Sequence, residues 1–436
     1  MLKIIVVSNV FPHIPNSTTI LFKNIVPIIK KKLEIKVFWI ITDDYGERIK
    51  VVDPNYEISY LSDYNNAREI LEKIKPDLSY HFIGNSITDY AFLVAERFLK
   101  IPSFGHADSQ YVLSQSNNEV VIGNYFREQT SRKKIFLEHV RQFFEKKNVG
   151  SENNIKANRG INFLKKYYFL IRTLRSIQKS HLEVIAELFE QIKLLYHPPS
   201  VGFQEKYNCD LIFTENSPSV DFLVNSGLKR ENIRVVGNPV WDNAFEKRDQ
   251  ILPKEDKKLN ILFITANLSS GQGKSDFSKA RRNQMIKETV TSLNQFHKEI
   301  SLVIKIHPTG ENYTEYSQLL EKFENVHLSQ KDDIIDLISK SDVIITPVTS
   351  TAAIIALIMN KPIIIWNYFH VEQDLLLRTD TALECKDISE LGNCLDSVKS
   401  FREKNAERIN KFIDENFSYG NSSQRVVSEI LDLVKK

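Results

Sequence analysis

Short apolar runs rich in Ile and Val alternate along the chain with longer segments whose apolar residues recur every three or four positions. The first pattern is typical of strands buried on both faces, and the second of helices that cover a sheet. In the first hundred residues the patterns predict strands at 3–8, 35–42, 77–82 and 101–105, and helices at 18–32, 67–74 and 89–100. This alternation favours an α/β fold with a parallel sheet and right-handed connections.

The alternation stops over residues 113–200, where the pattern is mostly helical, and this segment ends at His197-Pro198-Pro199-Ser200. It then resumes, with predicted strands at 209–213, 233–236, 260–265, 302–306, 326–328, 343–346 and 362–366. Predicted helices lie at 220–225, 282–298, 316–323, 334–339, 351–359 and 424–435. The domains implied are 1–245, with a helical insertion at about 113–200, and 259–415, joined by a charged linker at 246–258. A C-terminal helical segment, 416–436, is expected to pack back across the cleft between them.

Length and composition agree with two globular domains. The chain has 436 residues, which is too long for one ordinary core, and its hydrophobic content of 42% is that of a globular protein. No apolar run approaches the roughly 18–20 residues of a membrane span. The three cysteines are scattered, without a zinc spacing or a disulfide framework, so we expect a cytoplasmic protein.

The net charge of +3 hides a basic region within the insertion. Residues 131–200 contain fourteen Lys and Arg and six Glu, a net charge of 14 − 6 = +8. Around residues 160–180, Lys165, Arg172 and Lys179 recur every seven positions, with apolar residues at helical spacing on the other side. Such a helix either contacts an anionic membrane at its periphery or packs on its own domain with a solvated basic face. Nucleic acid is not expected, because no recognised binding motif accompanies the charge.

Two polar motifs follow predicted strands in the second half of the chain. His307-Pro308 comes directly after strand 302–306, and Thr349-Ser350-Thr351 separates strand 343–346 from a helix. Ligands bind at the carboxyl ends of parallel strands, and a helix N-terminus favours anions. The motifs therefore predict a phosphate pocket, although a histidine can also just end a strand and Ser or Thr is an ordinary helix N-cap.

The loop 267–275 contains Gly273-Lys274-Ser275 between a predicted strand and a predicted helix. A phosphate-binding P-loop would need glycine where Leu268 stands, so an NTPase is not predicted. Lys274 and the following Arg281 and Arg282 are candidate phosphate contacts, and a mobile solvated basic loop is the alternative.

Several stretches resemble the GT-B glycosyltransferases in order and spacing. They are Ser8-Asn9-Val10-Phe11-Pro12 with Phe22-Lys23-Asn24, the segment 232–242 with Gly237-Asn238-Pro239, the two strand-end motifs, and Tyr419-Gly420-Asn421-Ser422-Ser423-Gln424-Arg425. The His-Pro and Ser/Thr motifs resemble those of bacterial transferases that use CMP-sugars or CDP-glycerol. The last stretch is similar to a helix start in the UDP-N-acetylglucosamine 2-epimerase-like proteins, which belong to the same wider group.

The resemblance implies two Rossmann-like domains that face each other across a cleft. The nucleotide-sugar donor would bind mainly to the C-terminal domain, through His307, Pro308, Thr349, Ser350 and Thr351. Gly237 and Asn238 complete the expected donor contacts. No cofactor and no catalytic metal are expected, since helix dipoles and basic side chains can stabilise the leaving nucleotide.

Acid–base residues are expected on the N-terminal domain. His106 and Asp108 follow strand 101–105, so either is a candidate base for an acceptor hydroxyl, with an Asx-turn and a surface histidine as the simpler interpretation. Asp44 is a rival, because Asp43-Asp44-Tyr45-Gly46 weakly resembles an acidic motif of bacterial sialyltransferases that Tyr45 interrupts. His13, in the first loop, is a weaker candidate.

The sequence therefore predicts a metal-independent glycosyltransferase that moves a sugar from a CMP, CDP or UDP donor to a surface polysaccharide or glycolipid. Its expected partners are the donor and a glycan or lipid-linked acceptor at the inner face of the plasma membrane. Two alternatives stay open: a sugar-nucleotide 2-epimerase or hydrolase, and a non-catalytic relative that binds glycan or lipid. Two motifs depart from known relatives. The Glu-x7-Glu pair of the large retaining family is absent over 349–357, and Ser350-Thr351-Ala352-Ala353 does not match the Gly-Gly-Ile-Gln run of the epimerases.

Overall fold

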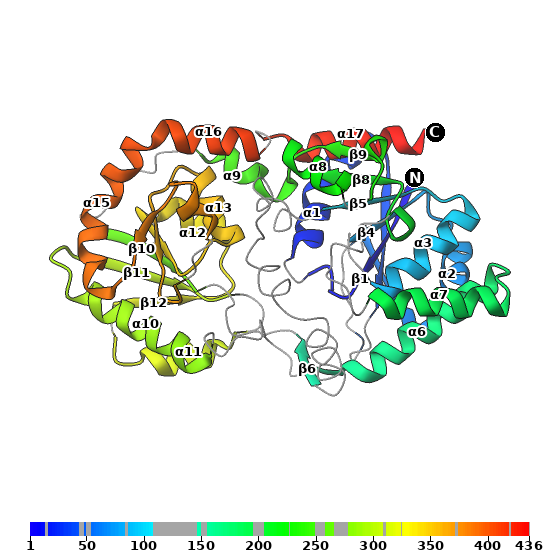
Figure 1. Ribbon diagram of the computed structural model, residues 1–436, viewed down its shortest axis with the longest axis horizontal. Helices are drawn as coiled ribbons and strands as arrows, with labels where there is room; N and C mark the ends of the chain where they lie inside the picture. Colours follow the sequence, from blue (N-terminus) through cyan, green and yellow to red (C-terminus); the bar gives the residue numbers. More distant parts are fainter. Residues whose placement is uncertain are drawn as a thin grey trace. The chain divides into compact units, whose positions relative to one another are not determined.

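A computed structural model of the chain gives the arrangement of its helices and strands (Figure 1). It describes residues 1–13, 16–42, 48, 54–82, 86–107, 146–149, 155–194, 205–225, 227–248, 258–265, 278–307, 311–323, 325–370, 374–417 and 420–435. These residues form two compact units. Unit 1 comprises Met1–Val240 together with Asn421–Lys436, and unit 2 comprises Trp241–Gly420.

Unit 1 is built on a seven-stranded parallel sheet in the order β3-β2-β1-β4-β5-β8-β9. Its strands are Leu2–Ser8 (β1), Ile35–Ile41 (β2), Tyr56–Tyr60 (β3), Leu78–Phe82 (β4), Ser103–His106 (β5), Leu211–Thr214 (β8) and Ile233–Val235 (β9). All seven residues of β1 pair in register with β2, from Leu2 opposite Ile35 to Ser8 opposite Ile41. A separate antiparallel hairpin joins Lys146–Val149 (β6) and Ile155–Asn158 (β7).

Helices cover both faces of this sheet, because its strands are apolar on both sides. They are Ser17–Lys30 (α1), Ala67–Ile74 (α2), Ile87–Leu99 (α3), Arg159–Ser176 (α6), His181–Leu194 (α7), Ser217–Asn225 (α8) and Ser422–Val434 (α17). One core buries alternate residues of β1 and β2, such as Ile4 and Trp39, against α1 and α17. The other buries Ile5 and Ile40 against α2, α3 and α6. The C-terminal helix α17 is thus part of unit 1, beside α1.

A buried charged group lies between β4 and α3 in unit 1. The His81 ring is 1% exposed and contacts two carboxylates, with Nδ1 3.1 Å from Asp89 Oδ1 and Nε2 3.0 Å from Glu96 Oε1. Burial by itself would lower the pKa of His81, but the charges and hydrogen bonds of Glu96 and Asp89 outweigh it and raise the pKa to about 10. The imidazolium therefore neutralises one of two carboxylates that the core could not otherwise hold.

Unit 2 has a six-stranded parallel sheet in the order β12-β11-β10-β13-β14-β15. Its strands are Leu259–Ile264 (β10), Ile300–Lys305 (β11), Val326–Ser329 (β12), Val343–Thr346 (β13), Ile363–Trp366 (β14) and Leu383–Cys385 (β15). The helices are Asp242–Glu246 (α9), Lys279–Asn294 (α10), Tyr313–Leu320 (α11), Ile334–Lys340 (α12), Thr351–Ile358 (α13), Leu375–Arg378 (α14), Leu391–Lys404 (α15) and Ala406–Asn416 (α16). One core of this unit packs β10, β11, β13 and β14 against α10, α11 and α15.

The predicted α/β class, with two parallel sheets and a largely helical insertion, is confirmed. The expectation of a mostly helical 113–200 segment was incomplete, because the β6–β7 hairpin precedes α6. The apolar side of the predicted basic helix is buried: Leu170 and Leu174 pack in the core with α3. The Cys residues are free and buried. No helix in the described ranges has both the length and the apolar character to span a bilayer.

We predict that His81→Leu destabilises the protein by about 3–5 kcal/mol, because the substitution leaves two carboxylates buried without their cation. Urea unfolding followed by circular dichroism measures the loss. His181→Leu, at the exposed start of α7, is the matched control and should change stability by no more than about 0.5 kcal/mol. Equal losses in the two variants would show that the buried group contributes nothing specific.

The same group predicts a pH dependence. The folded pKa of His81 lies above its ordinary 6.5, so its contribution to stability is fully present below pH 6.5 and is lost as the pH rises toward about 10. The stability difference between the wild type and His81→Leu should therefore shrink over that interval. A difference that stays constant from pH 6.5 to 10 would contradict a charged histidine.

Candidate functional site

The carboxyl edge of the unit 2 sheet brings together the two motifs that were predicted to bind phosphate. Strands β11, β10 and β13 are neighbours and parallel, so the residues that follow them lie at one edge. Thr265 follows β10, His307 follows β11 and Thr349 follows β13. His307 is half-buried, and the Gln330 side chain donates to its carbonyl oxygen at 3.2 Å.

Glu311 is the buried carboxylate of this edge. Its side chain is fully buried and accepts hydrogen bonds from the Thr265 hydroxyl at 2.8 Å, the Tyr316 hydroxyl at 2.7 Å and the His307 backbone N–H at 3.4 Å. Burial and the nearby carboxylate raise the pKa of Tyr316, so its phenol stays protonated and donates. Glu311 thereby fixes the backbone of His307, just after the end of β11.

Arg282 supplies the positive charge for Glu311. Its side chain is 3% exposed, with Nη1 3.3 Å from Glu311 Oε1, and Nη2 3.5 Å from Glu315 Oε2. The guanidinium carbon also lies 4.9 Å from the centre of the Tyr316 ring. These contacts fit a structural role better than the phosphate contact expected from the sequence.

Arg281 has a different setting from Arg282. Its guanidinium carbon lies 5.4 Å from the centre of the Tyr368 ring and 5.5 Å from that of Phe369, both of which follow β14. The side chain is half-buried, at the start of α10. A cation beside aromatic rings at the carboxyl edge is compatible with a nucleotide contact.

In the segment Thr349-Ser350-Thr351, the first two residues have distinct structural roles. Thr349 donates to Asp374 from both its backbone N–H and its hydroxyl, each at 2.6 Å. Burial raises the pKa of Asp374, although these hydrogen bonds oppose the shift. Ser350 is the N-cap of α13 and accepts from the Ala353 N–H at 3.3 Å. The N-cap interpretation of Ser350 is therefore correct, and it leaves the half-buried Thr351 at the positive end of the helix dipole.

The carboxyl edge of unit 1 carries a second polar group, at the ends of β5, β8 and β9. His106 is the last residue of β5, Glu215 follows β8, and Gly237 and Asn238 follow β9. The Asn238 side-chain amide donates to Glu215, and a hydrogen bond joins the His106 ring to the Gly237 backbone. Gly237 has φ of 79°, a conformation that favours glycine. Gly237 and Asn238 thus belong to unit 1, whereas the other described donor candidates belong to unit 2.

His106 is a neutral histidine at physiological pH. It is 6% exposed, and burial lowers its pKa to about 4, with the hydrogen bond to Gly237 opposing the shift only in part. Its Nε2 is buried and has no hydrogen-bond partner among the described residues. A neutral imidazole has one N–H that donates a hydrogen bond and one nitrogen that accepts one, and the lowered pKa makes it a weak proton acceptor.

Four of the predicted site residues, Pro308, Lys274, Asp108 and Asp44, lie outside the described residues. The described part adds three carboxylates that were not predicted: Glu215, Glu311 and Asp374. Glu215 could have been found, because it follows a predicted strand as His307 does. Glu311 and Asp374 carried no such signal, since their burial depends on residues far along the chain.

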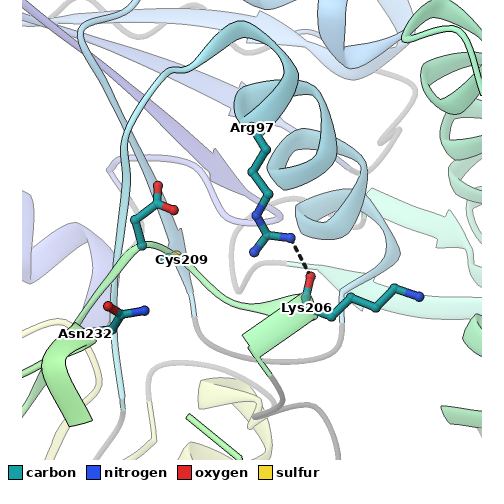
Figure 2. Close-up of a pocket in the computed structure, with 5 residues that line it drawn as sticks. Arg97, Lys206, Cys209 and Asn232 are labelled. Carbon is teal, nitrogen blue, oxygen red and sulfur yellow. Dashed lines mark hydrogen bonds between the residues drawn. The ribbon is translucent and has the colours of Figure 1, made fainter. Parts of the chain in front are cut away.

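A cavity of about 350 Å³ in unit 1 lies at the opposite edge of the sheet (Figure 2). Its lining residues are Arg97, Lys206, Cys209, Asp210 and Asn232, which end α3 or precede β8 and β9. Arg97 is held by donating to the backbone carbonyl of Lys206 at 2.8 Å. Because ligands of such sheets bind at the carboxyl ends of the strands, we do not assign the active site to this cavity. Among the described side chains, no group of three or more His, Cys, Asp or Glu is arranged to hold a metal ion.

Residues 207–431, slightly more than half of the chain, match the family described as UDP-N-acetylglucosamine 2-epimerase. No curated protein has a sequence that matches this chain. Among solved structures, the chain is similar to S. aureus MnaA in complex with UDP, with 15% identity and a TM-score of 0.52 over 100% of this chain and 98% of that one. The putative Listeria monocytogenes UDP-N-acetylglucosamine 2-epimerase has 14% identity and a TM-score of 0.53, over 100% and 97%.

The wall teichoic acid polymerase TagF is also similar, with 13% identity and a TM-score of 0.55 over 100% of this chain and 89% of that one. At such identities these structures show the fold alone. They confirm the predicted GT-B fold with two Rossmann-like domains, and the family match confirms the resemblance to the epimerase-like group.

We predict that Glu311→Gln destabilises the protein by about 3–5 kcal/mol, because it leaves the Arg282 cation buried without its buried partner. Glu315→Gln is the matched control, since Glu315 faces the same guanidinium but has a side chain that is 35% exposed. It should cost no more than about 1 kcal/mol. Urea unfolding of both variants measures the difference, and equal costs would show that the buried pair does not organise this edge.

Proposed function

The chain belongs to the UDP-N-acetylglucosamine 2-epimerase family, and we propose on this premise that it is a sugar-nucleotide 2-epimerase acting on a UDP-N-acetylhexosamine. The match over residues 207–431 carries this proposal, because it includes all of the described carboxyl edge of unit 2. The sequence interpretation had this activity as its alternative, and the family match favours it over the glycosyltransferase.

The nucleotide is proposed to bind at the carboxyl edge of unit 2. His307 and Thr351 are half-buried there, and α13 presents its N-terminus, which favours a phosphate. Arg281 beside Tyr368 adds a cation and an aromatic ring at the same edge. The similar S. aureus MnaA was solved with UDP, which supports a uridine nucleotide as the first ligand to test.

Inversion at C2 of the sugar breaks the C2–H bond on one face and forms a new one on the other; C2 is not next to a carbonyl, so the electron pair of the broken bond is balanced by departure of UDP from C1, and UDP returns to C1 when the proton is replaced. Substrate and product therefore have the same composition, but the reaction needs groups that accept and donate protons. We propose that the candidates are those of the unit 1 edge: His106 and Glu215, with Asp108 and Asp44 from the sequence interpretation. A neutral His106 can hydrogen-bond a reacting group through Nε2, but its lowered pKa makes it a weak proton acceptor, so Glu215 is the stronger candidate base of the two.

Transfer of a sugar from a CMP, CDP or UDP donor to a surface polysaccharide or glycolipid is the second candidate function. One observation favours it: Ser350-Thr351-Ala352-Ala353 does not match the Gly-Gly-Ile-Gln run that the resemblance to the epimerases implies. Ser350 is the N-cap of α13, so this residue of the run has a structural role. In this case the nucleotide would still bind at unit 2, and an acceptor would be consumed.

The test of the proposed reaction is incubation of the purified protein with UDP-N-acetylglucosamine, followed by proton NMR. An epimerase should produce the anomeric signal of the C2 epimer without any acceptor. Release of UDP without an epimer signal would contradict the 2-epimerase and indicate a hydrolase, or a transferase if release requires an acceptor. UDP binding without turnover of any sugar nucleotide would favour a non-catalytic relative.

We predict that His307→Ala weakens UDP binding or donor use at least about tenfold, because one charge-assisted hydrogen bond is worth about 1.5–3 kcal/mol. Isothermal titration with UDP, CMP and CDP measures the change and names the nucleotide class. His327→Ala, an exposed histidine in β12 of the same unit, is the control and should bind like the wild type. Unchanged affinity in His307→Ala would remove His307 from the pocket.

A further inference from the structure

Helices α6 and α7 expose an unusual share of large apolar side chains. Of the twelve exposed large hydrophobic residues in the described part of the chain, six lie on these two helices. They are Leu164 (59% exposed), Tyr168 (59%), Leu182 (79%), Ile185 (49%), Phe189 (61%) and Ile192 (42%). Single exposed apolar residues are ordinary, but a concentration of this kind on adjacent elements marks an interaction surface.

The outward face of α6 combines apolar and basic side chains. The opposite face is buried through Leu170 and Leu174, which pack in the core with α2 and α3. Leu164, Tyr168, Arg172 and Arg175 are exposed and follow one another at helical spacing on the outward side. The Arg172 guanidinium carbon lies 5.0 Å from the centre of the Tyr168 ring, so the basic and aromatic groups share one patch.

The charge of α6 has one sign only. Its eighteen residues include five basic ones, Arg159, Lys165, Lys166, Arg172 and Arg175, and no Asp or Glu. A helix that carries apolar and basic residues on its exposed side has the chemistry that matches anionic lipid headgroups above an apolar layer. An acidic protein partner would fit the charge, but it would leave the exposed apolar side chains without an apolar environment.

Helix α7 extends the apolar part of this surface. Leu182, Ile185, Phe189 and Ile192 follow a three-four-three spacing, which places them on one side of the helix. The buried Val184 and Gln191 lie on a different side. The stripe is therefore additional to the contacts that hold α7 on unit 1.

Acidic residues of α7 contact basic side chains of unit 1. Glu183 contacts Lys179 Nζ at 2.8 Å, and Glu187 contacts Lys206 Nζ at 2.8 Å. The Tyr90 hydroxyl also donates to Glu187 at 2.6 Å. These carboxylates therefore add little repulsion toward an anionic surface, and α6 itself contains no Asp or Glu.

We propose that the outward face of α6 and the apolar stripe of α7 form a docking surface for an anionic lipid bilayer. The basic side chains contact the headgroups, and Leu164, Tyr168 and the α7 stripe enter the boundary between headgroups and acyl chains. The contact is peripheral. It goes beyond the proposed sugar chemistry and does not depend on which reaction the enzyme performs.

The test is co-sedimentation of the full-length protein with vesicles of phosphatidylcholine alone and of phosphatidylcholine mixed with phosphatidylglycerol. We expect binding to the mixed vesicles, weakened by salt, and little binding to phosphatidylcholine alone. Arg172→Glu/Arg175→Glu should weaken binding at least about 25-fold, since each basic residue near the surface is worth about fivefold. Lys399→Glu/Lys404→Glu, on the exposed side of α15, is the control with the same change in charge and should bind like the wild type.

A second variant, Phe189→Ser, separates insertion from simple charge attraction. It should weaken binding while the remaining binding keeps its sensitivity to salt. Circular dichroism and UDP binding confirm that each variant is folded, so failure of the sugar chemistry and failure of docking are distinguishable. Absence of binding to mixed vesicles, or equal loss in the control, would overturn the proposal. So would a wild-type dimer that Phe189→Ser converts to monomer without changing vesicle binding, because the stripe would then join two copies of the chain.

Discussion

One buried carboxylate, that of Glu311, organises the carboxyl edge of the unit 2 sheet. It receives hydrogen bonds from Thr265 after β10, from His307 after β11 and from Tyr316 in α11, and its charge is met by Arg282. A buried carboxylate is tolerated only when its oxygens are bonded and its charge is paired. The backbone of His307 is consequently fixed through a carboxylate that also contacts the residue after β10 and two helices, which gives this polar edge a defined geometry.

Unit 1 shows how partners decide the behaviour of a buried histidine. His81 and His106 end or nearly end neighbouring strands and are both more than nine-tenths buried. His81 lies between Asp89 and Glu96 and has a pKa of about 10, whereas His106 contacts the Gly237 backbone and has a pKa of about 4. The first is a fixed cation that stabilises the core. The second has an Nε2 without a partner in the described part of the chain, at the edge where ligands of such sheets bind.

Family membership and local sequence point to the same ligand class but to different chemistry. The match over 207–431 supports a UDP-sugar and an epimerase, while the run Ser350-Thr351-Ala352-Ala353 departs from the epimerase pattern. Ser350 is the N-cap of α13, so this helix forms although the sequence differs from the epimerase pattern. Nucleotide binding can therefore be tested at His307 independently of the reaction, and the lipid-facing surface of α6 and α7 lies on elements that supply none of the candidate groups.

Much of the fold was determined by the sequence itself. Strands such as Leu2–Ser8 and Val343–Thr346 were predicted within a residue, because both faces of a parallel strand are buried and its sequence becomes a continuous apolar run. The short edge strands Tyr56–Tyr60 and Leu383–Cys385 were missed, since they mix polar and apolar residues. The positions of His307 and Thr349 after their strands were also visible, because parallel strands bring their carboxyl ends to one edge. Only the tertiary structure decided which polar groups are buried and with whom, because Glu311 meets Arg282 and Asp374 meets Thr349 across 25 residues or more, and no local pattern records such a pairing.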